Sequence, residues 1–302
     1  MSPPTSRLAP GDRPGLPDGI RPGGRYTQWR PGVPRYVVCD VDGTLVGPSA
    51  HATAEVAEAV ARAQQAGIRV GFATGRMRRA VERLYEQLAA RGPHLLHNGA
   101  EIRADGRTVA ALTLTPEQID RLLEIAQARD DAYLEVYTED GYHVSALDER
   151  ARPHWELLGT PPASVLTSAR DLGGAPALKA TYAVFDPDAV AEIVEAVRGI
   201  GLAAGPAGSP RTPAIIYCNA THRDADKGSA LTLACQHLGI EMAAAVAVGD
   251  AENDLPMLAV AGTAIAMAQA PDEVLAAAHL VVPDVDAHGA AIALDWATQQ
   301  AG

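Results

Sequence analysis

Short apolar runs alternate with amphipathic stretches in two separate parts of this 302-residue chain. The runs have the length of strands, and the stretches between them carry apolar residues at the spacing of one helix face. The expected strands lie at 36–39, 68–73, 94–97, 244–248, 264–267 and 280–282. The expected helices lie at 54–65, 76–90, 227–238, 253–261 and 271–278. Because strands joined by helices form parallel sheets with right-handed crossovers, the pattern predicts an α/β fold with a doubly wound, Rossmann-like core.

The two parts of the expected sheet are separated by a segment of different texture. Here Thr115, Pro116 and Gln118 form the signature of a helix start, and Asp140-Gly141 joins two β-rich runs as a hairpin. We therefore expect an α+β domain inserted into the doubly wound core. The predicted organisation is a disordered Pro/Gly/Arg-rich tail at 1–34, a core at 35–100 and 220–302, and the inserted domain at 101–219.

Composition excludes several classes of function. The net charge of −12 argues against a nucleic-acid surface, because such surfaces need clustered basic residues to contact phosphates. The three cysteines contain no CxxC pair, so they indicate neither a zinc site nor a disulfide framework. The longest apolar run is far shorter than the roughly 20 residues of a membrane span. We expect a cytoplasmic protein that binds neither nucleic acid nor membrane.

Acidic residues follow two of the expected strands. Asp40 and Asp42 come directly after the first strand, and Asp250 and Asp254 follow a later one. Since ligands of open α/β sheets bind beyond the carboxyl ends of the strands, we expect these two groups to face each other. Taken alone, the first pair also fits a solvated turn. Together the two groups are typical of a site for a hard cation with carboxylate ligands.

Two further features indicate an anion site at the same edge of the sheet. Thr74 and Gly75 follow the second strand, where a hydroxyl and free backbone N–H groups at a helix start bind anions. Lys227 begins an expected helix and is one of only two lysines in a chain with 23 arginines. Although most lysines are solvated surface charges, a compact ammonium beside clustered acids in an arginine-rich chain suggests a specific task.

Four sequence motifs carry a family resemblance. They are DVDGTL at 40–45, ATGR at 73–76, DADKGSAL at 224–231 and GDAENDLPML at 249–258. In this order they resemble the four motifs of the haloacid dehalogenase-like phosphohydrolases. The insertion between the second and third motifs, with NGA at Asn98, is similar to the Cof-type branch of sugar-phosphate phosphatases. The resemblance covers about residues 35–296 and implies that the inserted domain is a cap that closes over the site.

The resemblance also implies a role for each motif residue. Asp40 is expected to attack phosphorus and form an aspartyl-phosphate, and Asp42 to protonate the leaving alkoxide and then activate water. Mg²⁺ is the expected cofactor, held by the carboxylates of Asp40 and Asp250 and the backbone carbonyl of Asp42. Asp254 is expected to orient these groups as an outer partner. The residues expected to hold the phosphoryl oxygens are Thr74, Gly75, Lys227 and Asn253, with Thr74 and Lys227 counted as catalytic.

These expectations describe a Mg²⁺-dependent phosphatase that hydrolyses a small phosphorylated metabolite, such as a sugar phosphate. Two alternatives stay open, a phosphomutase or phosphotransferase that uses the same site, and a catalytically inactive metabolite-binding regulatory protein. The presence of Asp40, Asp42 and Lys227 favours an enzyme, since a site that has lost catalytic activity usually lacks such residues. The sequence leaves open the individual substrate and the oligomeric state.

Candidate substrate contacts beyond the phosphate site are Arg76, Asn98, Arg152, Arg211 and Tyr217. The last three also have a plainer interpretation. Arg152 fits a solvated face, Arg211 fits a loop charge, and Tyr217 fits the packing of a strand.

Overall fold

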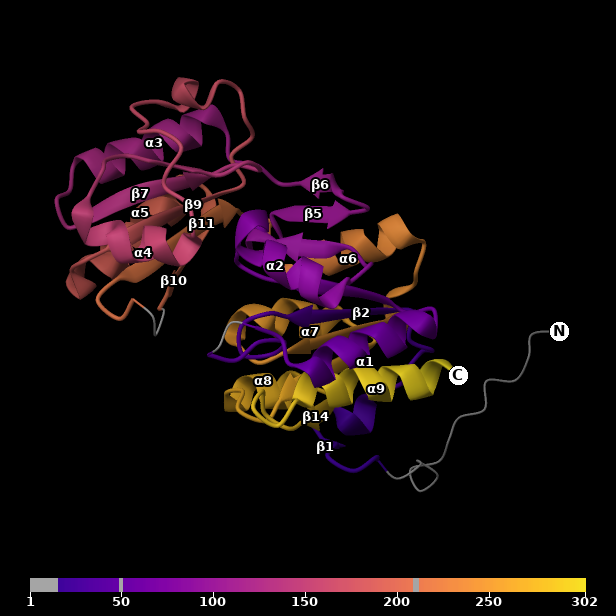
Figure 1. The fold of residues 1–302 in the computed structure, drawn as a ribbon. Helices are drawn as coiled ribbons and strands as arrows, with labels where there is room; N and C mark the ends of the chain where they lie inside the picture. The colour runs from indigo at the N-terminus through magenta and orange to yellow at the C-terminus, as the bar shows by residue number, and fades with distance from the viewer. Residues whose placement is uncertain (1–15, 49–50, 209–211) are drawn as a thin grey trace.

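Two sheets, each with its own helices, make up the protein (Figure 1). The computed structural model describes residues 16–48, 51–208 and 212–302. Within these residues the larger sheet has nine strands and the smaller sheet has five. We call the larger sheet and its helices the core, and the smaller sheet and its helices, formed by residues 112–222, the cap. The predicted α/β fold with an inserted α+β domain is confirmed.

The core sheet is parallel at its centre. Its strands are Arg21–Pro22 (β1), Tyr36–Asp40 (β2), Arg69–Ala73 (β3), His94–Leu96 (β4), Glu101–Ala104 (β5), Arg107–Ala111 (β6), Ala245–Gly249 (β12), Thr263–Met267 (β13) and Leu280–Val282 (β14). They lie in the order β1, β14, β13, β12, β2, β3, β4, β5, β6, and every pairing from β14 to β4 is parallel. The central strands are apolar and buried on both sides, as a sheet covered on two faces requires.

Helices cover both faces of the core sheet. One face carries Ala54–Gln65 (α1), Arg78–Leu88 (α2) and Gly289–Ala301 (α9), and the other carries Lys227–Leu238 (α6), Leu255–Val260 (α7) and Asp272–Ala277 (α8). Successive residues of β2 point to opposite faces, so Val37 packs with the first group of helices and Val38 with the second. The core is therefore doubly wound. In the part of the chain that the structure describes, no helix is both long and apolar enough to cross a membrane.

The cap is an antiparallel sheet with α-helices packed on both faces. Its strands are Ala132–Tyr137 (β7), Tyr142–Val144 (β8), Lys179–Val184 (β9), Leu202–Ala207 (β10) and Ile216–His222 (β11), and its helices are Pro116–Gln127 (α3), Arg152–Leu158 (α4) and Val190–Gly199 (α5). The strand order is β10, β11, β9, β7, β8. α3, which begins with the predicted Thr115 and Gln118 capping box, and α5 cover one face. The other face carries Tyr133, Tyr137 and Tyr217 and contacts Met77 of the core, so it is turned toward the core.

Part of the predicted tail is ordered on the core. Arg21 and Pro22 form β1, which pairs antiparallel with β14, and Ile20 is buried in the core. The indole Nε1 of Trp29 donates to Oγ1 of Thr263 at 3.1 Å, and its ring centroid lies 5.6 Å from that of Trp296. For residues 16–34 the prediction of disorder is therefore wrong, because a few apolar anchors suffice to dock a Pro- and Gly-rich segment. The prediction for residues 1–15 lies outside the described residues.

The boundaries of the inserted domain also differ from the prediction. The hairpin of β5 and β6 was expected to belong to the insertion, but β5 pairs antiparallel with β4 and extends the core sheet. At the other end, β11 belongs to the cap sheet through His222. Local patterns identify strands, whereas the sheet that a hairpin joins is decided by its long-range partner.

Candidate active site

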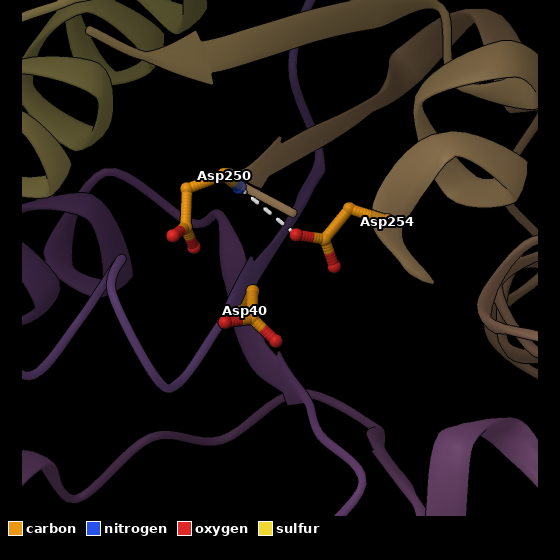
Figure 2. Close-up of side chains that lie close together, drawn as sticks. All are labelled: Asp40, Asp250 and Asp254. Atoms are coloured by element: carbon orange, nitrogen blue, oxygen red, sulfur yellow. Dashed lines mark hydrogen bonds between the residues drawn. The ribbon is translucent and has the colours of Figure 1, made fainter. Parts of the chain in front are cut away.

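Three acidic side chains meet where β2 and β12 end (Figure 2). These strands are parallel neighbours, so Asp40 at the end of β2 and Asp250 directly after β12 lie at the same edge of the sheet. Asp254 belongs to the short 3₁₀ helix Glu252–Asp254 (η7). One carboxylate oxygen from each of the three residues lies within 4.8 Å of the others. Of the four acidic residues that the sequence predicted to face each other, Asp40, Asp250 and Asp254 are brought together, whereas the carboxylate of Asp42 is bound by Arg76.

Asp254 is fully buried, and hydrogen bonds occupy both of its oxygens. Its Oδ2 accepts from the backbone N–H of Asp250 at 2.9 Å, the bond drawn in Figure 2, and from that of Ala251 at 3.0 Å. Its Oδ1 accepts from Nζ of Lys227 at 2.5 Å. These bonds fix the turn after β12 and the lysine relative to each other.

Lys227 bridges two carboxylates from inside the protein. Its Nζ donates to Oδ1 of Asp40 and to Oδ1 of Asp254, each at 2.5 Å, and its side chain is 0% exposed. Asp226, the N-cap of α6, places it by accepting the N–H groups of Gly228 and Ser229. Burial alone lowers the pKa of Lys227, but the charges of Asp40 and Asp254 outweigh burial and raise the pKa above its ordinary value. The ammonium therefore stays charged beside Asp40.

Asp250 is held on its other side by the loop that follows Asp40. The hydroxyl of Thr44 donates to Oδ1 of Asp250 at 2.8 Å. Gly43 has a φ of 90°, and a Cβ added there would lie 2.2 Å from Oδ2 of Asp250. The position therefore requires glycine both for its backbone conformation and for the close approach of the carboxylate.

Asp42 and Arg76 form a two-point ion pair. Nε of Arg76 donates to Oδ2 of Asp42 at 2.9 Å, and a second guanidinium nitrogen donates to Oδ1. The side chains are 57% exposed for Asp42 and 30% for Arg76. The arginine that the sequence offered as a substrate contact thus ties the loop after β2 to the loop after β3.

The polar groups after β3 and β4 gather beside this pair. The hydroxyl of Thr74 accepts the N–H of Arg76 at 3.1 Å, and the carbonyl of Thr74 accepts the N–H of Asn98. Asn98 has a φ of 57°, which asparagine tolerates, and its Oδ1 lies 3.4 Å from Nδ2 of Asn253. A Cβ on Gly75 would lie 2.9 Å from the same Oδ1. The residues expected to bind phosphate therefore line one edge of the sheet.

The cap candidates have contacts of other kinds. Arg152 donates to Glu149 at 2.7 Å, and both side chains are exposed, so Arg152 forms a surface pair. Tyr217 is buried, its hydroxyl lies 2.7 Å from that of Thr212, and its ring packs on His154. These contacts match the plainer interpretations, a solvated face and strand packing. Arg211 lies outside the described residues.

Sequence reasoning missed the second lysine of the chain. Lys179, the first residue of β9, is 8% exposed, and its Nζ donates to the carbonyl of Gly75 at 3.2 Å. This bond joins the cap to the loop that follows β3. The available signal was the rarity of lysine in this chain, which drew attention to Lys227 but applies equally to Lys179.

The acidic cluster fits a divalent cation with oxygen ligands. Three carboxylates converge, whereas Lys227 supplies one positive charge. Burial raises the pKa of Asp40 well above its usual range, against the effect of Lys227, and the charges of Asp254 and Asp250 raise it further. Burial likewise raises the pKa of Asp250, although the hydrogen bond from Thr44 opposes this effect. A hard divalent cation neutralises such an excess of buried negative charge.

Comparison with known protein families identifies the family of this chain. Residues 37–294 match the family model described as haloacid dehalogenase-like hydrolase. The chain belongs to this family. The predicted resemblance is therefore confirmed over most of the chain.

Curated relatives and solved structures agree with this assignment. The chain is 29% identical to the 5-amino-6-(5-phospho-D-ribitylamino)uracil phosphatase YwtE of Bacillus subtilis, over 86% of this chain and 96% of the relative. It is 30% identical to the HMP-PP phosphatase of Cronobacter sakazakii, over 78% of this chain and 85% of the relative. A phosphatase of the same superfamily from Bacteroides thetaiotaomicron has the same fold, with a TM-score of 0.74, 21% identity and coverage of 88% and 95%. The predicted enzyme class, a phosphoric monoester hydrolase, is confirmed.

Proposed function

We propose that the protein is a Mg²⁺-dependent phosphatase that hydrolyses a small phosphorylated metabolite through an aspartyl-phosphate on Asp40. The observation that carries the proposal is the setting of Asp40. Its Oδ1 is held by Lys227, its neighbours Asp250 and Asp254 are within reach of a shared cation, and no group of the described residues donates to its Oδ2. A carboxylate with one anchored and one available oxygen is suited to nucleophilic attack on phosphorus.

The proposed reaction has two steps, in which Asp40 acts as the nucleophile and Asp42 transfers the protons. In the first, an oxygen of Asp40 forms a bond to phosphorus, the ester P–O bond breaks, and Asp42 gives its proton to the leaving alkoxide oxygen. In the second, Asp42 takes a proton from water, the water oxygen attacks phosphorus, and Asp40 is released with inorganic phosphate. Asp42 must exchange its partner Arg76 for the leaving oxygen, and its exposed position allows that exchange.

Other residues hold the phosphoryl group in line. Lys227, the hydroxyl of Thr74, the N–H of Gly75 and Asn253 are the proposed donors, and preorganised donors stabilise the charge of the transferring group. Asp254 acts as a positioning residue through its bonds to Lys227 and to the turn after β12. Asp40, Asp250 and the backbone carbonyl of Asp42 would hold Mg²⁺, which supplies charge neutralisation on the phosphoryl oxygens.

The substrate class is supported by the two curated relatives. Both are named for small phosphorylated metabolites, and the alignments include the cap as well as the core. We carry over the class, a sugar phosphate or similar monoester, and not the individual compounds.

Phosphate release from a panel of phosphorylated metabolites with Mg²⁺ tests the proposal. We expect one class of monoesters to be hydrolysed, and Asp40→Asn to reduce kcat by about 10³-fold or more while the fold is kept. Asp188→Asn, an exposed carboxylate of the cap, is the matched control and should keep the wild-type rate. Turnover by Asp40→Asn at the wild-type rate would exclude Asp40 as the nucleophile.

A further inference from the structure

Lys179 is placed where the cap meets the proposed phosphate site. In the cap sheet it stands directly opposite Tyr137, on the face turned toward the core, and its Nζ lies 4.7 Å from the centroid of that ring. The same nitrogen donates to the carbonyl of Gly75. Because the N–H of Gly75 is a proposed phosphate donor, the ammonium contacts a residue of the proposed phosphate site.

Within the part of the chain that the structure describes, the ammonium of Lys179 forms no ion pair. Among the described residues no carboxylate oxygen lies within 4.0 Å of its Nζ, and one of its three N–H donors has a protein acceptor. Lys227, in contrast, reaches two carboxylates. Taking an ammonium out of water without such a partner costs free energy, so the arrangement favours an anion that arrives with a ligand.

The surrounding groups do not neutralise this charge. Glu135, two residues before Tyr137, uses its carboxylate to accept the hydroxyls of Tyr133 and Tyr137, and it contacts Nδ1 of His154 at 3.1 Å. His97, on the core side, is buried, and burial together with the charge of Lys179 lowers its pKa to about 3, so it is neutral. Burial lowers the pKa of Lys179 itself to about 8, while Glu135 opposes the effect. The ammonium is therefore still mostly charged near pH 7.

We propose that Lys179 binds a second anionic group of the substrate, a carboxylate or a further phosphate carried by the leaving group. The inference rests on the proposed function, since it takes Gly75 as part of the phosphate site. On binding, the ammonium exchanges a neutral carbonyl for an anion and gains a stronger, charge-assisted hydrogen bond. Lys179 is thus a specificity-determining residue that selects phosphomonoesters of acidic alcohols.

Matched substrate pairs test this selection. 3-Phosphoglycerate and glycerol 3-phosphate differ by a carboxylate in place of a hydroxymethyl group, and fructose 1,6-bisphosphate and fructose 6-phosphate differ by a second phosphate. We expect the wild-type enzyme to favour the more anionic member of at least one pair by about tenfold or more in kcat/KM. The preferred pair distinguishes a carboxylate from a phosphate as the second group.

Variants then assign the preference to Lys179. Lys179→Met should reduce the ratio of kcat/KM within the preferred pair to about one, and Lys179→Arg, which keeps the charge, should restore part of it. Arg121→Met removes one positive charge from the exposed side of α3 and should keep the wild-type ratio. Melting curves of each variant show whether it is folded, and the wild-type ratios test the proposal even if Lys179→Met does not fold.

Two results overturn the proposal in distinguishable ways. A wild-type enzyme that hydrolyses both members of each pair with equal kcat/KM, or a Lys179→Met enzyme that keeps the preference, excludes the second-anion site and leaves the phosphatase intact. An enzyme that hydrolyses no member of either pair and not p-nitrophenyl phosphate removes the proposed function and this inference with it.

Discussion

The core and the cap each bury one of the protein's two lysines, and they do so in opposite ways. In the core, Lys227 lies between Asp40 and Asp254, so its charge is compensated before any ligand arrives. In the cap, Lys179 has a backbone carbonyl and an aromatic ring as neighbours. A compensated cation fixes the geometry of a site, whereas an uncompensated one adds affinity for an anion. The contrast indicates that Lys227 preorganises the proposed reaction site in the core, whereas Lys179 in the cap selects the substrate.

The cap also differs from the core in its aromatic residues. The chain has only 4% aromatic residues, yet one cap cluster holds six of them. They are Tyr133, Tyr137, Tyr142, Trp155, Phe185 and Tyr217. One of them, Tyr137, lies against the ammonium of Lys179, and an aromatic ring has few rotatable bonds and supplies no counter-charge.

The largest expected effect is a difference in unfolding free energy between variants of the two lysines. Lys227→Met leaves Asp40 and Asp254 buried without their cation and should cost about 3–5 kcal/mol of unfolding free energy, together with nearly all turnover. Lys179→Met removes an unpaired buried charge and should leave the unfolding free energy equal or higher. Denaturant unfolding measures the unfolding free energy of both variants. An equal loss of unfolding free energy in the two would show that the lysines do not differ in charge compensation.

Metal binding should stabilise the core and depend on its acidic cluster. Mg²⁺ at about 100 times its Kd should raise the unfolding free energy by about 2.7 kcal/mol. The gain should vanish in Asp250→Asn and persist in Asp42→Asn, because the Asp42 carboxylate is paired with Arg76 and contributes only its backbone carbonyl to the proposed site. Excess chelator should stop hydrolysis by the wild type. Hydrolysis at an undiminished rate in chelator would exclude the metal.

The sequence predicted the part of the site that strand ends determine. Asp40 is the last residue of a buried strand, and Thr74 and Asp250 directly follow two others of the same sheet. Parallel strands bring such residues to a common edge. The Asp42–Arg76 pair and the Lys179–Gly75 contact were not predictable, because both depend on how separate loops and domains meet. The docking of residues 16–34 was missed for a similar reason, since β1 and Trp29 are stabilised by partners more than 230 residues away in the chain.

Substitution of Trp29 tests whether the segment 16–34 contributes to the stability of the core. Trp29→Ala removes the hydrogen bond to Thr263 and the contact with Trp296, and it should lower the unfolding free energy by about 2 kcal/mol. Turnover should stay at the wild-type value, because Trp29 contacts Thr263, the first residue of β13, whereas the candidate site lies at the carboxyl ends of the strands. Val33→Ala, at a side chain that is 61% exposed, is the matched control and should have little effect. An equally small effect at Trp29 would show that this segment is not part of the core.

The smallest expected effect lies at the junction of core and cap. His97 is buried, and within the described residues neither ring nitrogen forms a hydrogen bond, although Nε2 lies 3.7 Å from Oε2 of Glu101. The pKa of His97 falls from 6.5 to about 3 through burial and then through the charge of Lys179. As the pH drops below about 6.5, the unfolded chain takes up a proton that the folded chain does not, so stability declines down to about pH 3. Between pH 7 and 5.5, His97→Asn should lose about 1 kcal/mol less than the wild type, and asparagine tolerates the φ of 53° at this position. In a Lys179→Met background the difference should shrink, because the uncompensated cation of the cap no longer disfavours the proton on His97.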